Sequence, residues 1–238
     1  MSQLSAEPLP LAEAAYQRLR DDIIACRLEP GQRVTERGLG KQTGFGVSPI
    51  RDALTRLDHE GLVRTIPRKG YQVTPLTLKS VDDLFTFWQI IGPGVVKRGV
   101  INASDEQLEE IVRDFGRIES NLPAGQGAPE LLDVVESGNE LFTILAQASG
   151  NSYLAATYAR LSGELFRVWT LIADSDLVTV GELIDVTDWP EMIHRREADR
   201  LAQCAAEYIQ ACSDHVGRTL VRWPSVRTSE VVPLRASS

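Results

Sequence analysis

Hydrophobic residues recur at helical spacing along most of this chain of 238 residues. In the first third, the spacing predicts three helices, over residues 11–28, 36–43 and 49–61. Two short runs rich in β-branched and aromatic residues follow, at 62–66 and 71–73, and predict two strands joined by a turn. Three helices followed by a hairpin are the outline of a winged helix-turn-helix.

Start and stop signals mark the two middle helices of this region. Thr35 is a good N-cap for the short second helix, and Gly44 follows its predicted end. Ser48 is the predicted N-cap of the third helix, and Pro49 occupies its first position, where a missing N–H costs nothing. Gly61 ends that helix. The two helices are therefore separated by only a few residues, as a helix-turn-helix requires.

After residue 75 the hydrophobic pattern is helical throughout, and no alternating strand pattern appears. Six helices are predicted, over residues 78–100, 104–122, 129–149, 152–172, 190–211 and 213–222. We therefore expect a mainly α protein, with a winged helix-turn-helix domain over residues 1–75 and an all-α antiparallel helical bundle over 76–238. Such a bundle is large enough to enclose a ligand.

The charge of the chain is unevenly distributed. The net charge is −8, but residues 1–75 carry 11 Lys and Arg against 9 Asp and Glu, while residues 76–238 carry 14 against 24. A slightly positive first domain can bind the phosphate backbone of DNA, and the acidic remainder cannot. Because no apolar run reaches the length of a membrane span, we expect a cytoplasmic protein with no membrane partner.

The positive charges of the first domain lie where a DNA-binding unit needs them. The second helix of a helix-turn-helix enters the major groove with its N-terminal residues against the base edges. Arg51 lies near that end, and Arg68 and Lys69 lie in the turn of the hairpin. An ordinary helix pair with solvated charges is the alternative, because this geometry also occurs without DNA.

The order of residues from Ala14 to Pro75 resembles the N-terminal domain of the GntR family of bacterial transcription regulators. The matching segments are Tyr16–Arg20, Leu28–Arg37, Pro49–Leu54, Glu60–Val63 and Pro67–Val73. The resemblance implies DNA contacts by Arg37, Arg51 and Ser48, with Pro49 beside it, and by the wing residues Arg68, Lys69 and Gly70. A guanidinium can bind a guanine edge or a phosphate in a bidentate manner.

One position departs from the family pattern. Where the family usually reads Gly-Val-Ser-Arg-Thr-Pro, residues 44–49 read Gly-Phe-Gly-Val-Ser-Pro, so Val47 replaces an arginine that reads a base. Loss of one bidentate contact costs about 1–3 kcal/mol of discrimination at its base pair. We therefore expect an operator that differs from the usual family half-site at this position.

The second domain is similar to the FCD type of this family, over Leu84-Phe85, Leu145–Asn151 and His215-Val216. The resemblance implies a homodimer with a small effector in the bundle, commonly an organic acid, and often a divalent metal held by one Asp and three His. Here Gly138 and Phe142 stand at the usual Asp and His positions. A shift of one residue offers only Asn139 and Thr143, which are poor ligands.

Two histidines, His194 and His215, follow at a spacing of 21 residues, where the FCD type usually has 22. They are the candidate ligands of a residual divalent metal site, with ordinary helix histidines as the alternative. Trp88 and Gly92 replace the usual Arg and Glu of the first bundle helix, and Gly92-Pro93-Gly94 should kink or break it. With Trp88, Asn139 and Phe142 as candidate pocket residues, we expect an effector that is more apolar than usual or independent of metal.

These features predict a ligand-responsive regulator, a repressor that binds a pseudo-palindromic operator on double-stranded DNA as a homodimer. Two other classes stay open. One is an all-α enzyme with an appended DNA-binding head, although the chain lacks HExxH, nucleophile-elbow, Walker and dinucleotide motifs. The other is an architectural DNA binder without an effector.

Overall fold

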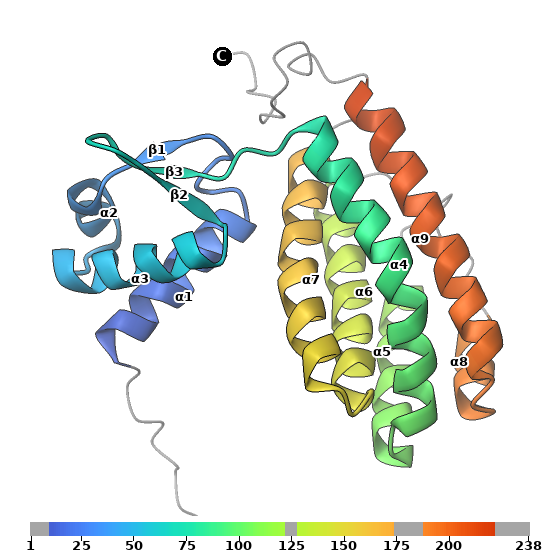
Figure 1. The fold of residues 1–238 in the computed structure, drawn as a ribbon. Coiled ribbons are helices and arrows are strands. Elements are labelled where there is room, and N and C mark those ends of the chain that lie inside the picture. The colour runs from blue at the N-terminus through green and yellow to red at the C-terminus, as the bar shows by residue number, and fades with distance from the viewer. Residues whose placement is uncertain (1–9, 122–127, 174–187, 222–238) are drawn as a thin grey trace, which may run out of the picture. The chain divides into compact units, whose positions relative to one another are not determined.

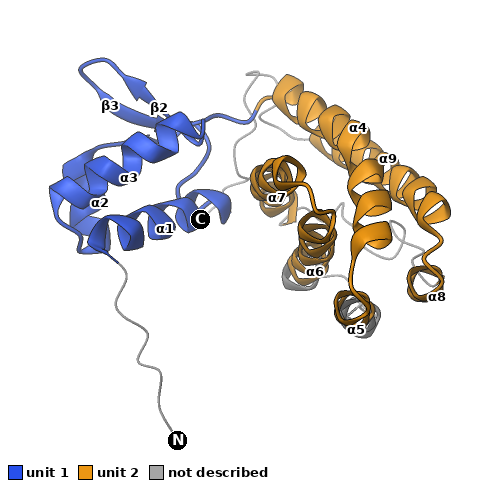
Figure 2. Cartoon of the chain, turned by 60° about the horizontal axis from the view of Figure 1, so that its bottom comes forward, with its two compact units in different colours: residues 1–76 blue, residues 77–238 orange. Residues whose placement is uncertain are grey.

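The computed structural model describes residues 10–121, 128–173 and 188–221. Contacts within the chain divide it into two compact units, Met1–Leu76 and Thr77–Ser238 (Figure 2). Each unit is described below by itself. None of the helices in the described ranges is long and apolar enough to cross a membrane.

The N-terminal unit is a three-helix domain with a small antiparallel sheet (Figure 1). Its elements are α1 (Leu11–Ile24), β1 (Arg33–Val34), α2 (Glu36–Thr43), α3 (Val47–His59), β2 (Val63–Ile66) and β3 (Gly70–Val73). The strand order is β1-β3-β2, with Arg33 opposite Gln72 and Ile66 opposite Gly70. Leu19, Ile50 and Leu57 are fully or almost fully buried in the core that α1 and α3 share.

The predicted helices of this unit are present, with altered ends. α1 stops at Ile24 instead of Leu28, because Cys26 adopts a left-handed φ of 52° and the Leu28 N–H donates to the Asp22 carbonyl. The buried Asp22 carboxylate accepts hydrogen bonds from Arg18 and Arg27 at 2.8 and 2.6 Å, which holds this turn together. The short strand β1 was not predicted.

The helical unit consists of six helices within the described residues. They are α4 (Leu78–Asn102), α5 (Asp105–Asn121), α6 (Ala128–Ala148), α7 (Ser152–Ala173), α8 (Trp189–His194) and α9 (Ala198–Val221). α4 and α9 run antiparallel to each other, and α6 lies between α5 and α7 (Figures 1 and 2). The predicted fold class, mainly α with a winged helix-turn-helix and a helical bundle, is confirmed.

Two predictions about the helices of this unit were wrong. α9 is one continuous helix, because Ile209, Cys212 and Val216 extend its buried stripe through the predicted break at Ser213. Residue 222, the predicted end of the last helix, lies outside the described residues. The α4 helix is also not broken at Pro93, because a single helix runs through this residue, with Gly92 close to the Ile209 side chain of α9.

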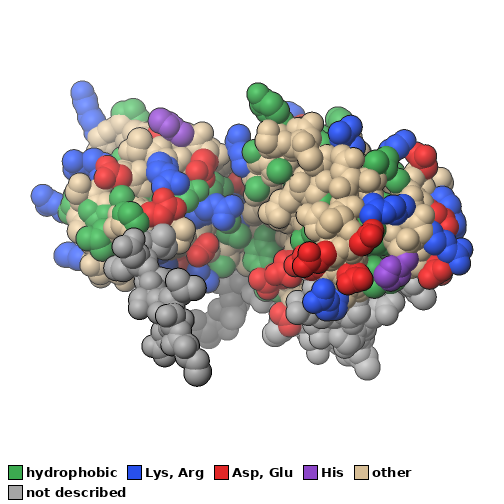
Figure 3. Space-filling model, turned by 90° about the horizontal axis from the view of Figure 1, so that it is seen from below, with side chains coloured by type: hydrophobic (Ala, Val, Ile, Leu, Met, Phe, Trp, Pro, Cys, Tyr) green, Lys and Arg blue, Asp and Glu red, His purple; other side chains and the backbone are tan. Residues whose placement is uncertain are grey.

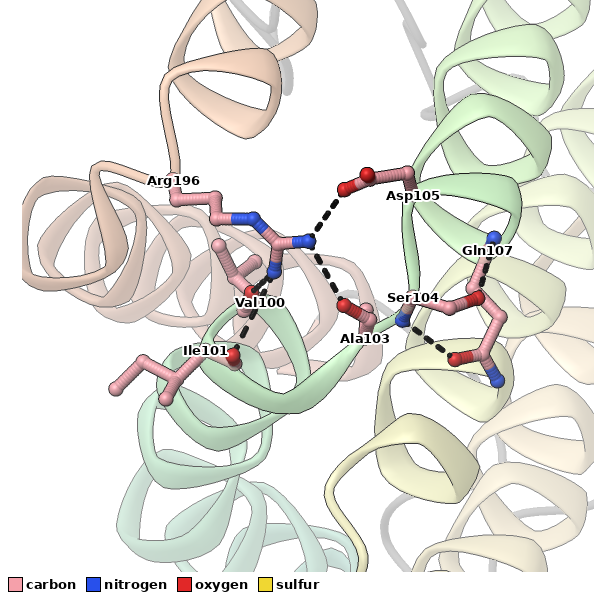
Figure 4. Close-up of polar contacts among 7 residues, drawn as sticks. All are labelled: Val100, Ile101, Ala103, Ser104, Asp105, Gln107 and Arg196. Carbon is pink, nitrogen blue, oxygen red and sulfur yellow. Dashed lines mark hydrogen bonds and ion pairs between the residues drawn. The ribbon is translucent and has the colours of Figure 1, made fainter.

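Arg196 joins three helices at one end of this unit (Figure 4). It precedes α9, and its guanidinium donates to the Val100 and Ala103 carbonyls at the end of α4, both at 2.9 Å. It also forms an ion pair with Asp105 at the start of α5, at 2.8 Å. Carbonyls at the end of a helix have no partner within the helix, so the arginine supplies one.

Candidate nucleic-acid interface and ligand site

The helix-turn-helix leaves the N-terminal end of α3 exposed. The Thr35 hydroxyl accepts from the Gly38 N–H at 3.1 Å and caps α2, and Gly44 ends α2 with a left-handed φ of 82°. α3 begins at Val47 with Gly46 as its N-cap, so the predicted N-cap role of Ser48 was wrong. Val47 and Ser48 therefore lie exposed in the first turn of α3.

Arg51 is the exposed cation of this end of α3, and it is held by α2. Its Nε and Nη2 donate to the two carboxylate oxygens of Glu36 at 2.9 and 2.8 Å, while 60% of its side chain stays exposed. The hydrogen bond from Arg51 lowers the pKa of the Glu36 carboxyl, so the pair stays charged below the usual titration range of a glutamate. Glu36 thus orients a guanidinium that still faces solvent.

The β2–β3 turn carries the second group of predicted residues. Arg68 and Lys69 are exposed, and Arg68 has a φ of 63°. Gly70 has a φ of 87°, and a Cβ there would lie 2.7 Å from the Val34 carbonyl oxygen. Only glycine fits this position, because any side chain would collide with the backbone that leads into α2.

The start of α3 and the turn of the hairpin lie at the same end of the N-terminal unit (Figure 1). Arg37, on α2, is exposed as well. Side chains of Lys and Arg project from the edges of this unit, whereas Asp and Glu gather on the face of the helical unit seen in Figure 3. The structure thus brings an exposed helix start and a basic turn to one end.

Sequence reasoning missed two supporting groups at this site. Glu36, which holds Arg51, has no local signal because the two residues are 15 positions apart. Arg64 on β2 donates to the Gln72 side chain on β3 at 3.0 and 2.6 Å, and Gln72 in turn donates to the Gly31 carbonyl at 2.8 Å. These bonds tie the hairpin to the segment before β1.

The interior of the helical unit contains a cluster of aromatic rings. Trp88 of α4 and Phe142 of α6, two of the candidate pocket residues, are buried with ring centroids 5.6 Å apart. Tyr158 and Tyr208 also belong to the cluster, with centroids 5.7 and 6.2 Å from Phe142. The third candidate, Asn139, lies half-buried on α6 in the turn before Phe142.

Two donors in this aromatic cluster lack hydrogen-bond partners among the described residues, namely Trp88 Nε1–H and the Tyr158 hydroxyl. Burial raises the pKa of Tyr158 well above its ordinary value and that of Cys212, on α9, to about 12. The cluster is therefore an uncharged environment with two unsatisfied hydrogen-bond donors. Buried groups of this kind normally have a partner, which a bound ligand can provide.

Two family models match the chain. Residues 11–73 match the model described as "Bacterial regulatory proteins, gntR family", and residues 83–211 match the FCD domain. The chain belongs to the GntR family and carries an FCD domain. The chain spans about half to two thirds of the length of the first curated relatives that it matches.

Relatives of this GntR-family protein are named as transcription regulators. YdhC of Bacillus subtilis, described as an uncharacterized HTH-type transcriptional regulator, is 28% identical over 62% of this chain and 65% of its own length. The HTH-type transcriptional repressor RspR of Escherichia coli is 22% identical over 87% of this chain and 89% of its own. The solved structure of E. coli McbR/YncC has the same fold, with a TM-score of 0.73 at 16% identity over 89% of this chain and 99% of that one.

The two candidate metal ligands lie on different helices of the helical unit. His194 is exposed at the end of α8, whereas His215 is buried on α9 and stacks on Trp169 at 6.1 Å. α9 is continuous, so the 17 residues from Ala198 to His215 rise about 25 Å along the helix, and His194 belongs to the separate helix α8. No group of three or more potential ligands occurs in the described ranges. Exposed His194 and buried His215 thus lie in different surroundings, and neither belongs to a larger ligand group among the described residues; a residual metal site stays a prediction.

Proposed function

We propose that this protein is a cytoplasmic, ligand-responsive repressor that binds a pseudo-palindromic operator as a homodimer. The main support is the exposed start of α3, where Arg51 is oriented by Glu36 next to Ser48. This end enters the major groove, and Lys69 and Gly70 of the wing approach the adjacent minor groove. One winged helix-turn-helix domain contacts few base pairs, so two such domains on two half-sites together supply the affinity.

Val47 determines which base pair is preferred at its position in each half-site. It is 41% exposed at the first residue of α3 and is apolar. An apolar side chain cannot bind the O6 and N7 acceptors of guanine, but it can contact the C5-methyl group of thymine. The operator therefore carries a T·A pair where an arginine would select guanine.

Selection from randomised DNA tests this specificity. We expect the wild-type protein to select thymine at the Val47 position and Val47→Arg to select guanine there. Replacing that thymine by uracil removes only the methyl group, and should weaken binding of the wild type severalfold without changing the affinity of Val47→Ala.

Selection of guanine by the wild type, or equal loss with uracil for both proteins, would refute the role of Val47. Failure to select any sequence would instead refute operator binding.

The effector binds at the aromatic cluster and has an apolar body with one or two acceptor atoms. Trp88 Nε1–H and the Tyr158 hydroxyl are the donors that meet those acceptors. A metal-bound dicarboxylate lacks ligands here, because Gly138 and Phe142 supply none and His194 lies elsewhere. The effector acts by binding better to one arrangement of the two heads than to the other.

Thermal unfolding with a panel of aromatic carboxylates and ketones tests this effector class. We expect at least one compound to raise Tm and change operator affinity, and we expect EDTA to leave Tm unchanged. Tyr158→Phe removes only the hydroxyl, so it should not lower the stability of the free protein. The same variant should reduce the ligand-induced rise in Tm.

A drop in Tm with EDTA that zinc reverses would instead support a divalent metal in the effector site. A compound that acts equally on wild type and Tyr158→Phe would place its site elsewhere, and no response to any compound would favour an architectural DNA binder.

A further inference from the structure

One face of α4 carries large apolar side chains that the described residues leave uncovered. Phe87, Ile90 and Ile101 are 40%, 73% and 54% exposed. Their spacing, with Gly94 between them, places them on a single stripe of the helix. The opposite stripe, which includes Phe85 and Val96, is buried in the unit.

Two further features of this stripe suit a partner, namely open space at its middle and opposite charges toward its two ends. A Cβ at Gly94 would meet no described atom within 4 Å, so the middle of the stripe is open. Asp83 and Arg98 lie on the same stripe, seven residues to one side of Ile90 and eight to the other. Both are exposed, and Arg98 forms no ion pair with any described residue. Asp83 pairs only with the exposed Lys79 of its own helix, at 2.6 Å.

The order of these residues is complementary to itself. When two copies of α4 pack antiparallel about a two-fold axis between positions 90 and 91, residue 87 of one copy lies opposite residue 94 of the other. A phenylalanine ring then meets the open surface of a glycine. In the same register residue 83 lies opposite residue 98, so that Asp83 faces Arg98 twice, once on each side of the axis.

We propose that the outer face of α4 is the homodimer interface of the FCD domain, formed by an antiparallel pair of α4 helices with Phe87 packed over Gly94 and Asp83 paired with Arg98. This proposal rests on the homodimer proposed above and names its interface. Contact along the whole stripe requires a shallow crossing, with an angle near +20°. A two-fold interface uses the same surface on both subunits, which is what this stripe offers.

Cysteine cross-linking of the full-length protein tests the register. Ile90→Cys lies beside the proposed axis, so it should give a covalent dimer on mild oxidation. Phe87→Cys alone should not, because the two copies of residue 87 are about 10 Å apart along the helices. Adding Gly94→Cys to Phe87→Cys should restore the cross-link. The parent protein is the control for Cys26, Cys204 and Cys212.

Sedimentation equilibrium tests the contribution of the stripe to association. Ile90→Asp should raise the dimer dissociation constant at least tenfold, whereas Tyr153→Asp, at an 85% exposed position of α7, should leave it unchanged. Asp83→Lys and Arg98→Glu should each weaken the dimer, and the double variant should recover part of the loss.

The outcomes separate the interface from the proposed function. A wild-type protein that is monomeric at all concentrations would overturn both the interface and the homodimer. A dimer that resists Ile90→Asp and does not cross-link through Ile90→Cys would overturn the interface alone. A normal dimer with no operator affinity would leave the interface standing and refute the regulator.

Discussion

Arg51→Ala is expected to reduce affinity for the selected operator by about 5- to 150-fold, which corresponds to the loss of roughly 1–3 kcal/mol. Arg51 is the oriented guanidinium at the exposed start of α3, and Glu36 fixes its position with hydrogen bonds of 2.9 and 2.8 Å. Fluorescence anisotropy with labelled operator and with unrelated DNA, at one fixed salt concentration, measures both affinity and discrimination. Because the residue is exposed, the variant should unfold at the same temperature as the wild type.

Arg56→Ala is the matched control on the same helix. Arg56 pairs with Glu13 of α1 at 2.6 Å and lies over the Tyr16 ring at 3.7 Å, so it serves the packing of α3 on α1. We expect its operator affinity to stay within about twofold of the wild type. An equal loss in both variants would mean that the effect of Arg51 arises from general positive charge.

The dependence of affinity on salt separates a contact to a base from a contact to a phosphate. If Arg51 reads a base, Arg51→Ala should relax sequence preference at one position and leave the salt slope unchanged. Lys69→Ala, in the exposed wing, should instead reduce the slope by about one with little change in preference. Glu36→Gln should mimic a mild form of Arg51→Ala, because the guanidinium loses its carboxylate partner.

Features with a local cause could be predicted from the sequence. Thr35 and Gly44 bound α2 because capping and a left-handed turn depend on the residue itself. The start of α3 was predicted wrongly, because Ser48 is a good cap by residue type whereas the helix begins two residues earlier with Gly46 as its N-cap. Strand β1 has only two residues, which is too short for any periodicity, and it exists because β3 offers hydrogen bonds to Arg33 and Val34.

Features that depend on distance between elements could not be predicted in this way. The spacing of His194 and His215 along the chain could not show that His194 ends the short helix α8 in an exposed position while His215 is buried far along α9. Sequence also predicted a kink or a break at Pro93, but α4 is not broken there and packs closely on α9 at Gly92. The pairing of Arg51 with Glu36 likewise follows only from the packing of α2 on α3.

The helical unit depends on one close backbone contact, at Gly99 of α4. A Cβ at this position would lie 2.5 Å from the Leu145 carbonyl oxygen and 2.9 Å from its Cα, both in the backbone of α6. Leu145 lies in the last turn of α6 and its carbonyl accepts from the Ser149 N–H, so this backbone cannot move aside alone and α4 and α6 would have to separate. We expect Gly99→Ala to reduce the free energy of unfolding of this unit by about 3 kcal/mol, at the upper end of the usual cost of overpacking.

Two other glycines provide a graded comparison for Gly99→Ala. At Gly92 the added Cβ would meet the end of the Ile209 side chain, which can rotate, so Gly92→Ala should cost less. At Gly217 it would meet no described atom within 4 Å, so Gly217→Ala should gain up to about 1 kcal/mol from helix propensity. All four tryptophans lie beyond residue 76, and urea unfolding followed by tryptophan fluorescence therefore reports on the helical unit alone.

The order of the three stabilities is the decisive result of that comparison. If Gly99→Ala lowered the free energy of unfolding no more than Gly217→Ala does, α4 and α6 would be further apart than the structure places them. The N-terminal unit has its own hydrophobic core, from Ala15 to Val73, which does not include α4. Gly99→Ala should therefore leave the N-terminal unit folded while it loosens the helical unit that, in the proposed homodimer, couples two such N-terminal units. Loss of ligand response with retained affinity for a single half-site is the functional consequence that we expect.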